Sequence, residues 1–412
     1  MKISVIMANY RSEAYLQAAM DSVLRQTHHD LELIVSDDAS GDGSVGLVRA
    51  AMAADARVKL VEAPQNAGPG AARNRALDLA SGDWIAVSDS DDLMHPDRLA
   101  RLLAAAQRLG ADFVADDKLF FGETADASGC TLLGSLDLHA PMEIDAELFV
   151  RASGMSSDLP ALGYLKPLMR REGIAGLRYD ESLRIGEDYD FYLRALLRGV
   201  RFVALPDPMY LYRRHSGSIS YRLSSPTLRA MIAAHDRIVR QTGEDALGRA
   251  MAARRAGLAE ALRYQELVDA IKARRFGAAL WQMLRAPALA GALLQSLSQR
   301  LHRVQAEVQP RKPWVLWLGG HAPPGDVPEG AGEWLAPLMP PEAGLPWQAP
   351  PGPVAAHLSD LAARCDLDVR AEGGAALWAL WLIPRWQTAT VRIDAAARDA
   401  TPLPIPEGAR RD

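Results

Sequence analysis

The chain has 412 residues, a length typical of two or three domains, and 49% hydrophobic residues, enough for a globular core. The formal net charge of −5 is small for this size and gives no basic surface for a nucleic-acid partner. Its two cysteines, Cys130 and Cys365, are far apart and outside any CxxC pair, which argues against disulfides or a zinc site and favours a reducing compartment.

The N-terminus opens with a short apolar run at 3–8, which is followed by polar residues and by Glu13. This run is too short for the apolar region of a signal peptide and predicts a strand. No stretch reaches about 18 uncharged apolar residues, so we predict no transmembrane helix. We therefore expect a cytoplasmic protein.

Strands and helices alternate through the first 120 residues. Continuous apolar runs predict strands at 3–8, 31–35, 58–61 and 84–87. Apolar residues at helical spacing predict helices at 16–24, 45–52, 71–80 and from 96 to 106. This alternation predicts an α/β fold, a mostly parallel sheet with helices on both faces. Such sheets bind ligands at the carboxyl ends of their strands.

The pattern changes beyond residue 120. Helices are predicted near 145–152 and 187–198, a strand near 201–205, and almost continuous helix at 226–304. Residues 321–353 contain ten prolines and predict a linker or surface segment, which is followed by a helix at 354–365 and an apolar patch at 377–386. The predicted divisions of the chain are 1–222, a mainly helical region at 223–310, and a tail rich in proline, glycine and tryptophan at 311–412.

An acidic segment, SDSDD from Ser88 to Asp92, follows the strand at 84–87. Its closely spaced carboxylates suit a hard cation such as Mg²⁺ or Mn²⁺, which typically takes one or two protein carboxylates and fills its shell with phosphates and water. An acidic turn before the helix that begins near Pro96 would have the same sequence. The residues alone leave both interpretations open.

A second acidic motif, GEDYDF at 186–191, opens the helix predicted at 187–198. Glu187 or Asp188 lies in its first turn, where the helix dipole favours a carboxylate. One interpretation is charge matching at the helix end. The other is a general base that removes the proton of an incoming hydroxyl.

The segment at 66–74, NAGPGAARN, predicts a tight turn into a helix. Asn66 and Gly68 belong to the turn, and Arg73 lies in the first turns of the helix. A glycine-rich turn at a helix N-terminus is a common anion site, although such turns are also ordinary connections.

The segment at 212–220, YRRHSGSIS, is basic, rich in hydroxyl groups and follows a predicted strand. It brings Arg214 and His215 to the strand end as candidate ligands. A lone histidine is more often structural, and this alternative also stays open.

The order and spacing of these motifs resemble the inverting family 2 glycosyltransferases of GT-A (Rossmann-like) fold. The resemblance covers residues 1–222, and its part at 176–224 is most similar to bacterial exopolysaccharide enzymes of the succinoglycan type. The motifs that carry it are ANYRSEAYL at 8–16, VSDDASGDGS at 35–44, NAGPGAARNRAL at 66–77, WIAVSDSDD at 84–92, GLRYDESLRIGEDYDFYLRALLRG at 176–199 and YLYRRHSGSIS at 210–220.

The resemblance implies an activity. It implies a metal-dependent, inverting hexosyltransferase that moves a sugar from a nucleotide-sugar donor, with UDP-glucose expected. The acceptor is expected to be a hydroxyl of a glycan or lipid-linked oligosaccharide in bacterial polysaccharide synthesis. A rival within enzymes, a nucleotidyltransferase, would need a glycine-rich basic loop after the first strand, where this chain has ANYRSEAY. A non-catalytic carbohydrate-binding or scaffold protein is the alternative outside enzymes.

The resemblance also assigns roles to single residues. The nucleotide is expected against Ala8, Asn9, Tyr10, Glu13, Asp37 and Asp38, with Asp38 accepting a hydrogen bond from uracil. The rest of the donor is expected against Asn66, Gly68, Arg73, Asp89, Ser90 and Arg214. The divalent metal is expected at Asp91, with Asp89 and His215 in its shell. The base is expected to be Asp188, next to Glu187.

The C-terminal half offers weaker signals. Residues 272–304 mix arginines with apolar residues and are interrupted by Pro287. Such a helix can lie on an anionic membrane at its cytoplasmic face, or it can pack its apolar side on the catalytic domain, which is the commoner arrangement. Seven of the nine tryptophans lie in the tail, where they could bind sugars or hold the tail to the surface. The oligomeric state is left open.

Overall fold

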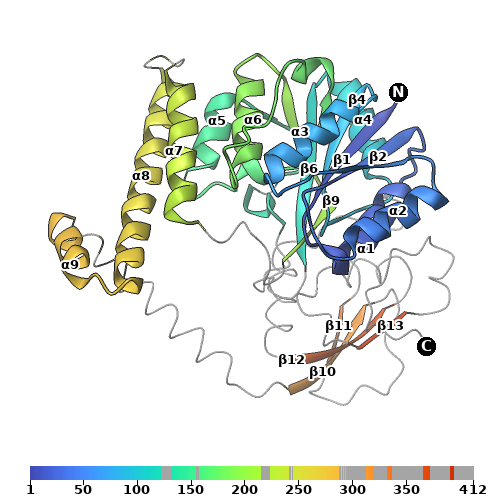
Figure 1. The fold of residues 1–412 in the computed structure, drawn as a ribbon. Coiled ribbons are helices and arrows are strands. Elements are labelled where there is room, and N and C mark those ends of the chain that lie inside the picture. Colours follow the sequence, from blue (N-terminus) through green and yellow to red (C-terminus); the bar gives the residue numbers. More distant parts are fainter. Residues whose placement is uncertain are drawn as a thin grey trace.

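The computed structural model describes residues 1–121, 131–136, 138–154, 157–214, 223–240, 243 and 245–286, with three positions between 289 and 293 (Figure 1). It also describes the backbone of four strands between 312 and 393. His215, Pro287 and most of the tail lie outside these ranges.

The central sheet of the described residues has nine strands in the order β3-β2-β1-β4-β8-β6-β9-β5, and β7 pairs with β9. β1 to β4 run parallel to one another, as do β6 and β9, whereas β8 is antiparallel to both β4 and β6. The strands are β1 (Ile3–Asn9), β2 (Leu31–Asp37), β3 (Val58–Glu62), β4 (Trp84–Asp89), β5 (Leu93–Met94), β6 (Phe113–Phe121), β7 (Met142–Ile144), β8 (Leu168–Arg170) and β9 (Phe202–Arg213).

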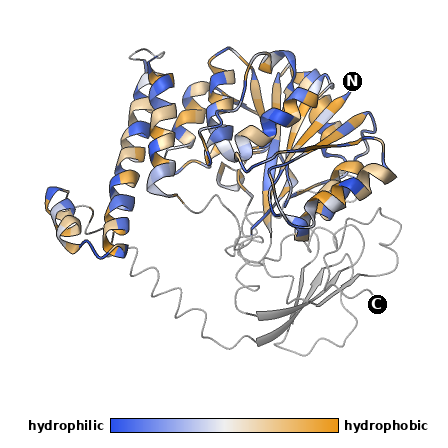
Figure 2. Cartoon of the chain, viewed as in Figure 1, coloured by the Kyte–Doolittle hydropathy of each residue, from blue (hydrophilic) through white to orange (hydrophobic). Residues whose placement is uncertain are grey.

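Helices cover both faces of this sheet, and each face has its own apolar core. One core joins the sheet to α3, α5 and α6, and the other joins it to α1, α2 and α4. Figure 2 shows the apolar residues along the strands between these layers. The helices are α1 (Glu13–Leu24), α2 (Ser44–Ala54), α3 (Pro69–Leu79), α4 (Arg98–Leu109), α5 (Ala146–Ala152) and α6 (Glu187–Leu196).

The predicted α/β architecture is confirmed, including the four strands and four helices of the first 110 residues. The sequence analysis missed β5, β6, β7 and β8, and β9 extends eight residues beyond the predicted strand near 201–205. β6 escaped prediction because its middle is charged: Asp116, Asp117 and Lys118 are all buried within it. Buried charges inside a strand already suggest a functional centre nearby.

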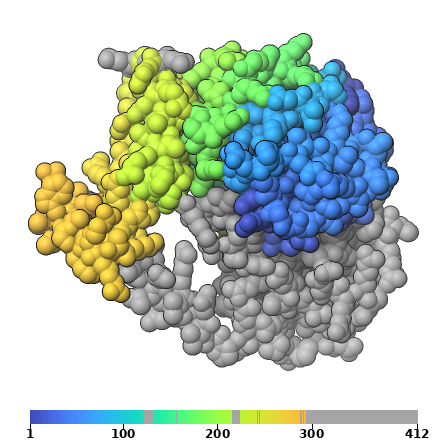
Figure 3. All heavy atoms as spheres, viewed as in Figure 1, coloured from blue at the N-terminus to red at the C-terminus, as the bar shows by residue number. Residues whose placement is uncertain are grey.

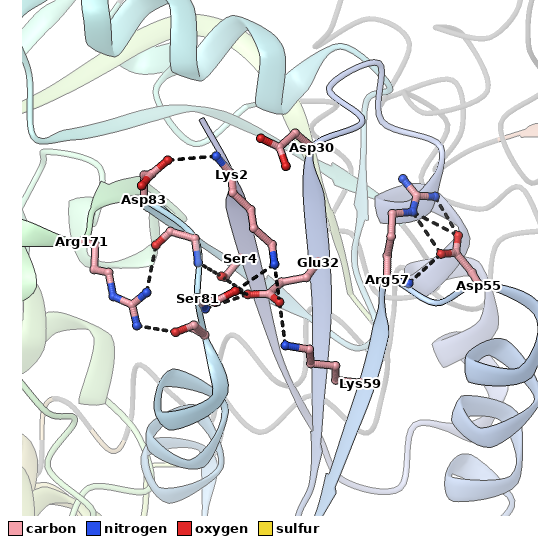
Figure 4. A network of polar contacts seen from close by, with 12 residues as sticks. Lys2, Ser4, Asp30, Glu32, Asp55, Arg57, Lys59, Ser81, Asp83 and Arg171 are labelled. Carbon is pink, nitrogen blue, oxygen red and sulfur yellow. Dashed lines mark hydrogen bonds and ion pairs between the residues drawn. The ribbon is translucent and has the colours of Figure 1, made fainter.

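An ion network ties the amino ends of the strands together, at the edge opposite the predicted site (Figure 4). The buried carboxylate of Glu32 accepts hydrogen bonds from Lys2 (2.9 Å), Lys59 (2.8 Å) and the hydroxyls of Ser4 and Ser81 (2.6 and 2.9 Å). Burial alone would raise the pKa of Glu32, but these bonds hold it well below its ordinary value. This edge is therefore structural.

Three further helices follow the sheet: α7 (Ser225–Val239), α8 (Ala246–Lys272) and α9 (Phe276–Arg285). α7 and α8 pack against each other, and α8 also contacts α5 (Figure 1). The prediction of almost continuous helix is corrected at two places. α7 ends at Val239 and α8 begins at Ala246, and at 273–275 Arg274 takes a left-handed φ of 57° and the chain turns before α9. None of the helices in the described part of the chain is long and apolar enough to span a bilayer.

The tail contains a parallel sheet of four strands in the order β11-β10-β12-β13 that the sequence analysis did not predict. The strands are β10 (Lys312–Leu318), β11 (Gly332–Leu335), β12 (Cys365–Ala371) and β13 (Thr390–Ile393). Cys365, predicted as the last residue of a helix, is instead the first residue of β12. The rest of that helix and the apolar patch at 377–386 lie outside the described residues.

Candidate active site

The carboxyl ends of β1, β2 and β4 bring the predicted nucleotide-binding residues side by side. Register pairs Asn9 with Asp37 and Ala8 with Asp89. The buried Asn9 amide donates to Asp37 Oδ1 at 2.7 Å, and Asp37 also accepts from the backbone N–H of Ser40 at 3.0 Å. Asp37 thus stabilises the turn after β2, and its expected contact with the nucleotide stays a prediction.

Asp38 is buried against the glycine-rich turn that precedes α3. Its carboxylate accepts from the backbone N–H groups of Ala67 (3.0 Å) and Gly68 (2.7 Å) and from Arg75 Nη2 (2.7 Å). Gly68 has a φ of 98°, a conformation that favours glycine. In this arrangement Asp38 fixes the turn, so hydrogen bonding to a nucleotide base would add to, or replace, one of these bonds.

The remaining residues of the predicted nucleotide pocket lie around this edge. Tyr10 is exposed, and Glu13 at the start of α1 accepts from the backbone N–H of Gly43 at 2.9 Å. Asn66 Oδ1 accepts from Arg184 Nη1 at 2.6 Å. Ser90 is buried and shares a hydrogen bond of 2.8 Å with the hydroxyl of Ser12. The structure therefore gathers the predicted residues at one end of the sheet.

The centre of the site is an ion network that joins three elements. Arg73 of α3 contacts Asp89 at the end of β4 (2.8 Å) and both Glu187 and Asp188 in the first turn of α6 (2.5 and 3.2 Å). The ammonium of Lys166 lies between Asp89 (2.7 Å) and Asp188 (2.8 Å). Two cations thus link the first aspartate of the D-x-D element to the predicted base.

Burial and charge act against each other in this network. Burial alone would raise the pKa of Asp89, but the positive charges of Lys166 and Arg73 outweigh it and lower that pKa. Burial would lower the pKa of Lys166, yet Asp188 and Asp89 raise it. The pKa of Glu187 is raised by burial and by the adjacent Asp188. Asp89 and Lys166 are therefore held as a charged pair inside the site.

The acidic turn after β4 is held by the end of β9. The Arg213 backbone N–H donates to Asp92 Oδ1 at 2.7 Å, and Arg213 Nε donates to the carbonyl of Asp91 at 2.8 Å. Burial, together with Asp91 and Asp89, raises the pKa of Asp92 well above its ordinary range. Asp92 therefore stabilises the turn, while Asp91 lies half-buried within it.

Of the two residues predicted as ligands after β9, the structure describes Arg214 but not His215. Arg214 is placed with its guanidinium 4.1 Å from the centre of the Phe120 ring. His215 lies outside the described residues, so its role stays a prediction. The residue that reaches the acidic turn in the structure is Arg213, which the sequence analysis did not single out.

Two buried lysines also escaped the sequence analysis. Lys166 follows an apolar stretch, and Lys118 lies in the middle of β6. Among the described residues, Lys118 Nζ has no hydrogen-bond partner and lies 5.0 and 4.7 Å from the ring centres of Tyr210 and Tyr212. Burial, together with the charge of Lys166, lowers its pKa to about 7. For Lys166 the available signal was its place next to an apolar stretch, since lysine is almost never buried without a partner. Lys118 follows two aspartates, so its sequence context gave no such signal.

The residues present fit a metal bound mainly through its substrate. Within the described ranges no group of three His, Cys, Asp or Glu side chains is placed to hold a metal ion. Both oxygens of Asp89 already contact cations, and Asp91 lies two residues further along the acidic turn. One or two carboxylates plus phosphate oxygens is the ordinary protein environment of Mg²⁺.

The mostly parallel sheet, helices on both faces and polar groups at the strand ends define a GT-A type α/β protein. The profile of glycosyl transferase family 2 matches residues 4–125. The succinoglycan biosynthesis protein ExoO of Rhizobium meliloti (strain 1021) is 33% identical over 339 residues, which cover 82% of this chain and 94% of that protein. The chain belongs to glycosyltransferase family 2.

Other known proteins share parts of the chain. The succinoglycan biosynthesis protein ExoU of the same organism is 41% identical over 177 residues, or 42% of this chain and 50% of that protein. The mannosyltransferase PcManGT from Pyrobaculum calidifontis, solved with GDP-Man and Mn²⁺, has a TM-score of 0.48 and 17% identity, covering 73% of this chain and 80% of that chain.

Proposed function

We propose that this chain is an inverting glycosyltransferase of bacterial exopolysaccharide synthesis, with Asp188 as the general base. The observation that carries the proposal is the ion network in which Lys166 and Arg73 join Asp188 to Asp89. The proposal is supported by the closeness of Asp188 to Asp89 at the end of β4, the edge at which we expect the donor. Membership of family 2 and the 33% identity to a succinoglycan biosynthesis protein support the reaction class and the biological setting.

In the proposed reaction, the acceptor hydroxyl gives its proton to the carboxylate of Asp188. Its oxygen then forms a bond to the anomeric carbon of the donor sugar. The bond from that carbon to the diphosphate breaks on the opposite side, which inverts the configuration and releases the nucleoside diphosphate. Arg73 and Lys166 supply positive charge beside the departing group.

A Mg²⁺ or Mn²⁺ ion held by Asp91, with Asp89 and His215 as further candidates, would offset the negative charge of the diphosphate. We propose a UDP-sugar, with UDP-glucose first, as donor, and a glycan or lipid-linked oligosaccharide as acceptor. Neither rival interpretation gains support, because membership of glycosyltransferase family 2 favours sugar transfer over nucleotidyl transfer or a scaffold role.

A thermal-shift panel tests the donor class and the metal. UDP, GDP, dTDP and CMP are added with and without Mn²⁺ to the wild type and to Asp91→Asn. Ligand at 100 times its dissociation constant should stabilise the fold by about 2.7 kcal/mol. We expect a shift with UDP that requires Mn²⁺ and is lost in Asp91→Asn. No shift with any nucleotide would contradict the proposal.

A further inference from the structure

Helix α9 presents an apolar face that no described part of the chain covers. Phe276, Leu280 and Leu284 repeat every fourth residue along one side and are 65%, 56% and 71% exposed, with Trp281 beside them at 54%. The other side of the helix packs on α8: Ala279 belongs to a buried cluster with residues of that helix. α9 is therefore anchored from behind, with its front toward solvent.

This exposure is unusual for the molecule. The other large apolar side chains that are exposed in the described core, such as Met52, Leu79 and Tyr164, are scattered singly, which is normal for a protein surface. On α9 four of them lie together beyond the end of α8, and Figure 3 shows α9 and that end of α8 projecting from the α/β body. A contiguous apolar patch of this kind marks an interaction site.

The charges around this face indicate its partner. Residues 272–286 contain Lys272, Arg274, Arg275 and Arg285 and no acidic residue, hence a formal charge of +4, although the whole chain carries −5. The Arg285 guanidinium lies 3.6 Å from the centre of the Trp281 ring, so cation and aromatic group occupy the same edge. Two acidic residues near the end of α8 have partners of their own: Asp269 accepts hydrogen bonds from Ser225 and Gln265, and Glu266 pairs with Arg229.

We propose that α9 docks this protein on an anionic lipid bilayer. A helix with a wide apolar face, a tryptophan and a rim of arginines lies in the interface plane, with its apolar side below the headgroups and its cations among anionic lipids. The helix is too short to span the membrane, which takes about 20 residues. Lipid binding is independent of the donor chemistry, but its use in reaching a membrane-borne acceptor rests on the proposed function.

Co-sedimentation of the full chain with lipid vesicles tests whether α9 binds an anionic bilayer. The vesicles contain phosphatidylglycerol and phosphatidylcholine in one series and phosphatidylcholine alone in the other. The test variant is Leu280→Gln/Leu284→Gln, and the matched control is Leu79→Gln, which replaces a leucine that is 43% exposed on α3. A third variant, Arg274→Gln/Arg275→Gln, removes charge and leaves the apolar face.

We expect the wild type and the Leu79 control to bind the anionic vesicles, and the double leucine variant to bind at least ~10-fold more weakly. The arginine variant, which keeps Lys272 and Arg285, should bind the anionic vesicles about 10-fold more weakly and depend less steeply on phosphatidylglycerol. Circular dichroism and the UDP-dependent melt, recorded on each variant, separate a loss of lipid binding from a loss of fold or of donor binding.

Three results would overturn the proposal: no binding of the wild type to anionic vesicles, equal binding by the leucine variant, or a fall in oligomeric mass of that variant without lipid. The last would assign the face to a second copy of the chain. A failure of the nucleotide melt with intact lipid binding would instead count against the proposed function alone.

Discussion

Lys166→Met removes the cation that lies between the two carboxylates of the proposed mechanism. The ammonium contacts Asp89 at 2.7 Å and Asp188 at 2.8 Å, and the lysine side chain is only 5% exposed. Methionine has similar length and fills the same space without charge. The substitution therefore tests the charge itself, with little change in packing.

The distances in the ion network give the expected size of the loss in stability and in rate for Lys166→Met. At 2.8 Å and an effective dielectric constant of about 20, the attraction between Lys166 and Asp188 is roughly 6 kcal/mol before desolvation is subtracted. Loss of one partner of a buried pair typically costs about 3–5 kcal/mol. Arg73 still contacts both carboxylates, so we expect a stability loss near ~3 kcal/mol. The two carboxylates should then move apart, and a displacement of ~1 Å in a site typically costs ~10²-fold in rate.

The assay measures kcat for sugar transfer from UDP-glucose, together with urea unfolding. Lys59→Met is the matched control, because Lys59 also contacts a buried carboxylate at 2.8 Å but lies at the opposite edge of the sheet. We expect kcat to fall about 100-fold in Lys166→Met, to recover in part in Lys166→Arg, and to be unchanged in Lys59→Met. Wild-type kcat in a folded Lys166→Met protein would refute this reasoning.

Two further predictions concern stability. Arg98→Met should lower the free energy of unfolding, measured in urea, by about 3–5 kcal/mol, because its fully buried guanidinium pairs with the buried Asp116 at 2.7 Å. An unchanged urea midpoint would contradict this prediction. Glu32→Gln should destabilise the protein at pH 7, because the folded-state pKa of Glu32 lies well below its ordinary value of 4.5. The stability from that carboxylate is present above pH 4.5 and is lost as the pH falls toward the folded-state value, so variant and wild type should converge in acid. A pH-independent difference between their urea midpoints would be incompatible with this linkage.

The part of the fold that could be predicted is the part in which local pattern and burial agree. β1, β2 and β4 are mainly apolar strands buried along almost their whole length, β3 is a shorter and partly buried edge strand, and the helices between them carry apolar residues at regular spacing. β6 and β8 break that rule. β6 contains three charged residues that are buried through tertiary contacts, and β8 is only three residues long. Neither leaves a periodic signal in the sequence.

The residues of the candidate site likewise fall into those that local sequence pattern predicts and those that only tertiary contacts bring together. Asp188 and the acidic turn could be placed because each lies at the end of a predicted element, and the structure confirms that Glu187 and Asp188 open α6. The role of Lys166 could not be predicted, because its partners Asp89 and Asp188 are distant in the sequence and meet only in the folded protein. The turn at Arg274 was missed for a similar reason, since arginine has good helix propensity and the packing of α9 on α8 involves residues on both sides of the turn.

The most direct test of the account compares Asp188→Asn with Asp190→Asn. Both aspartates lie in the first turn of α6, but Asp190 points to Arg194 of the same helix, at 2.5 Å. The measurement is the transfer of labelled glucose from UDP-glucose to lipid-extractable acceptor in bacterial membranes that make an exopolysaccharide. We predict a 10²–10⁴-fold loss of turnover in Asp188→Asn, with the UDP melt shift retained, and near-normal turnover in Asp190→Asn. Near-normal turnover in Asp188→Asn, with a functional wild type, would contradict it.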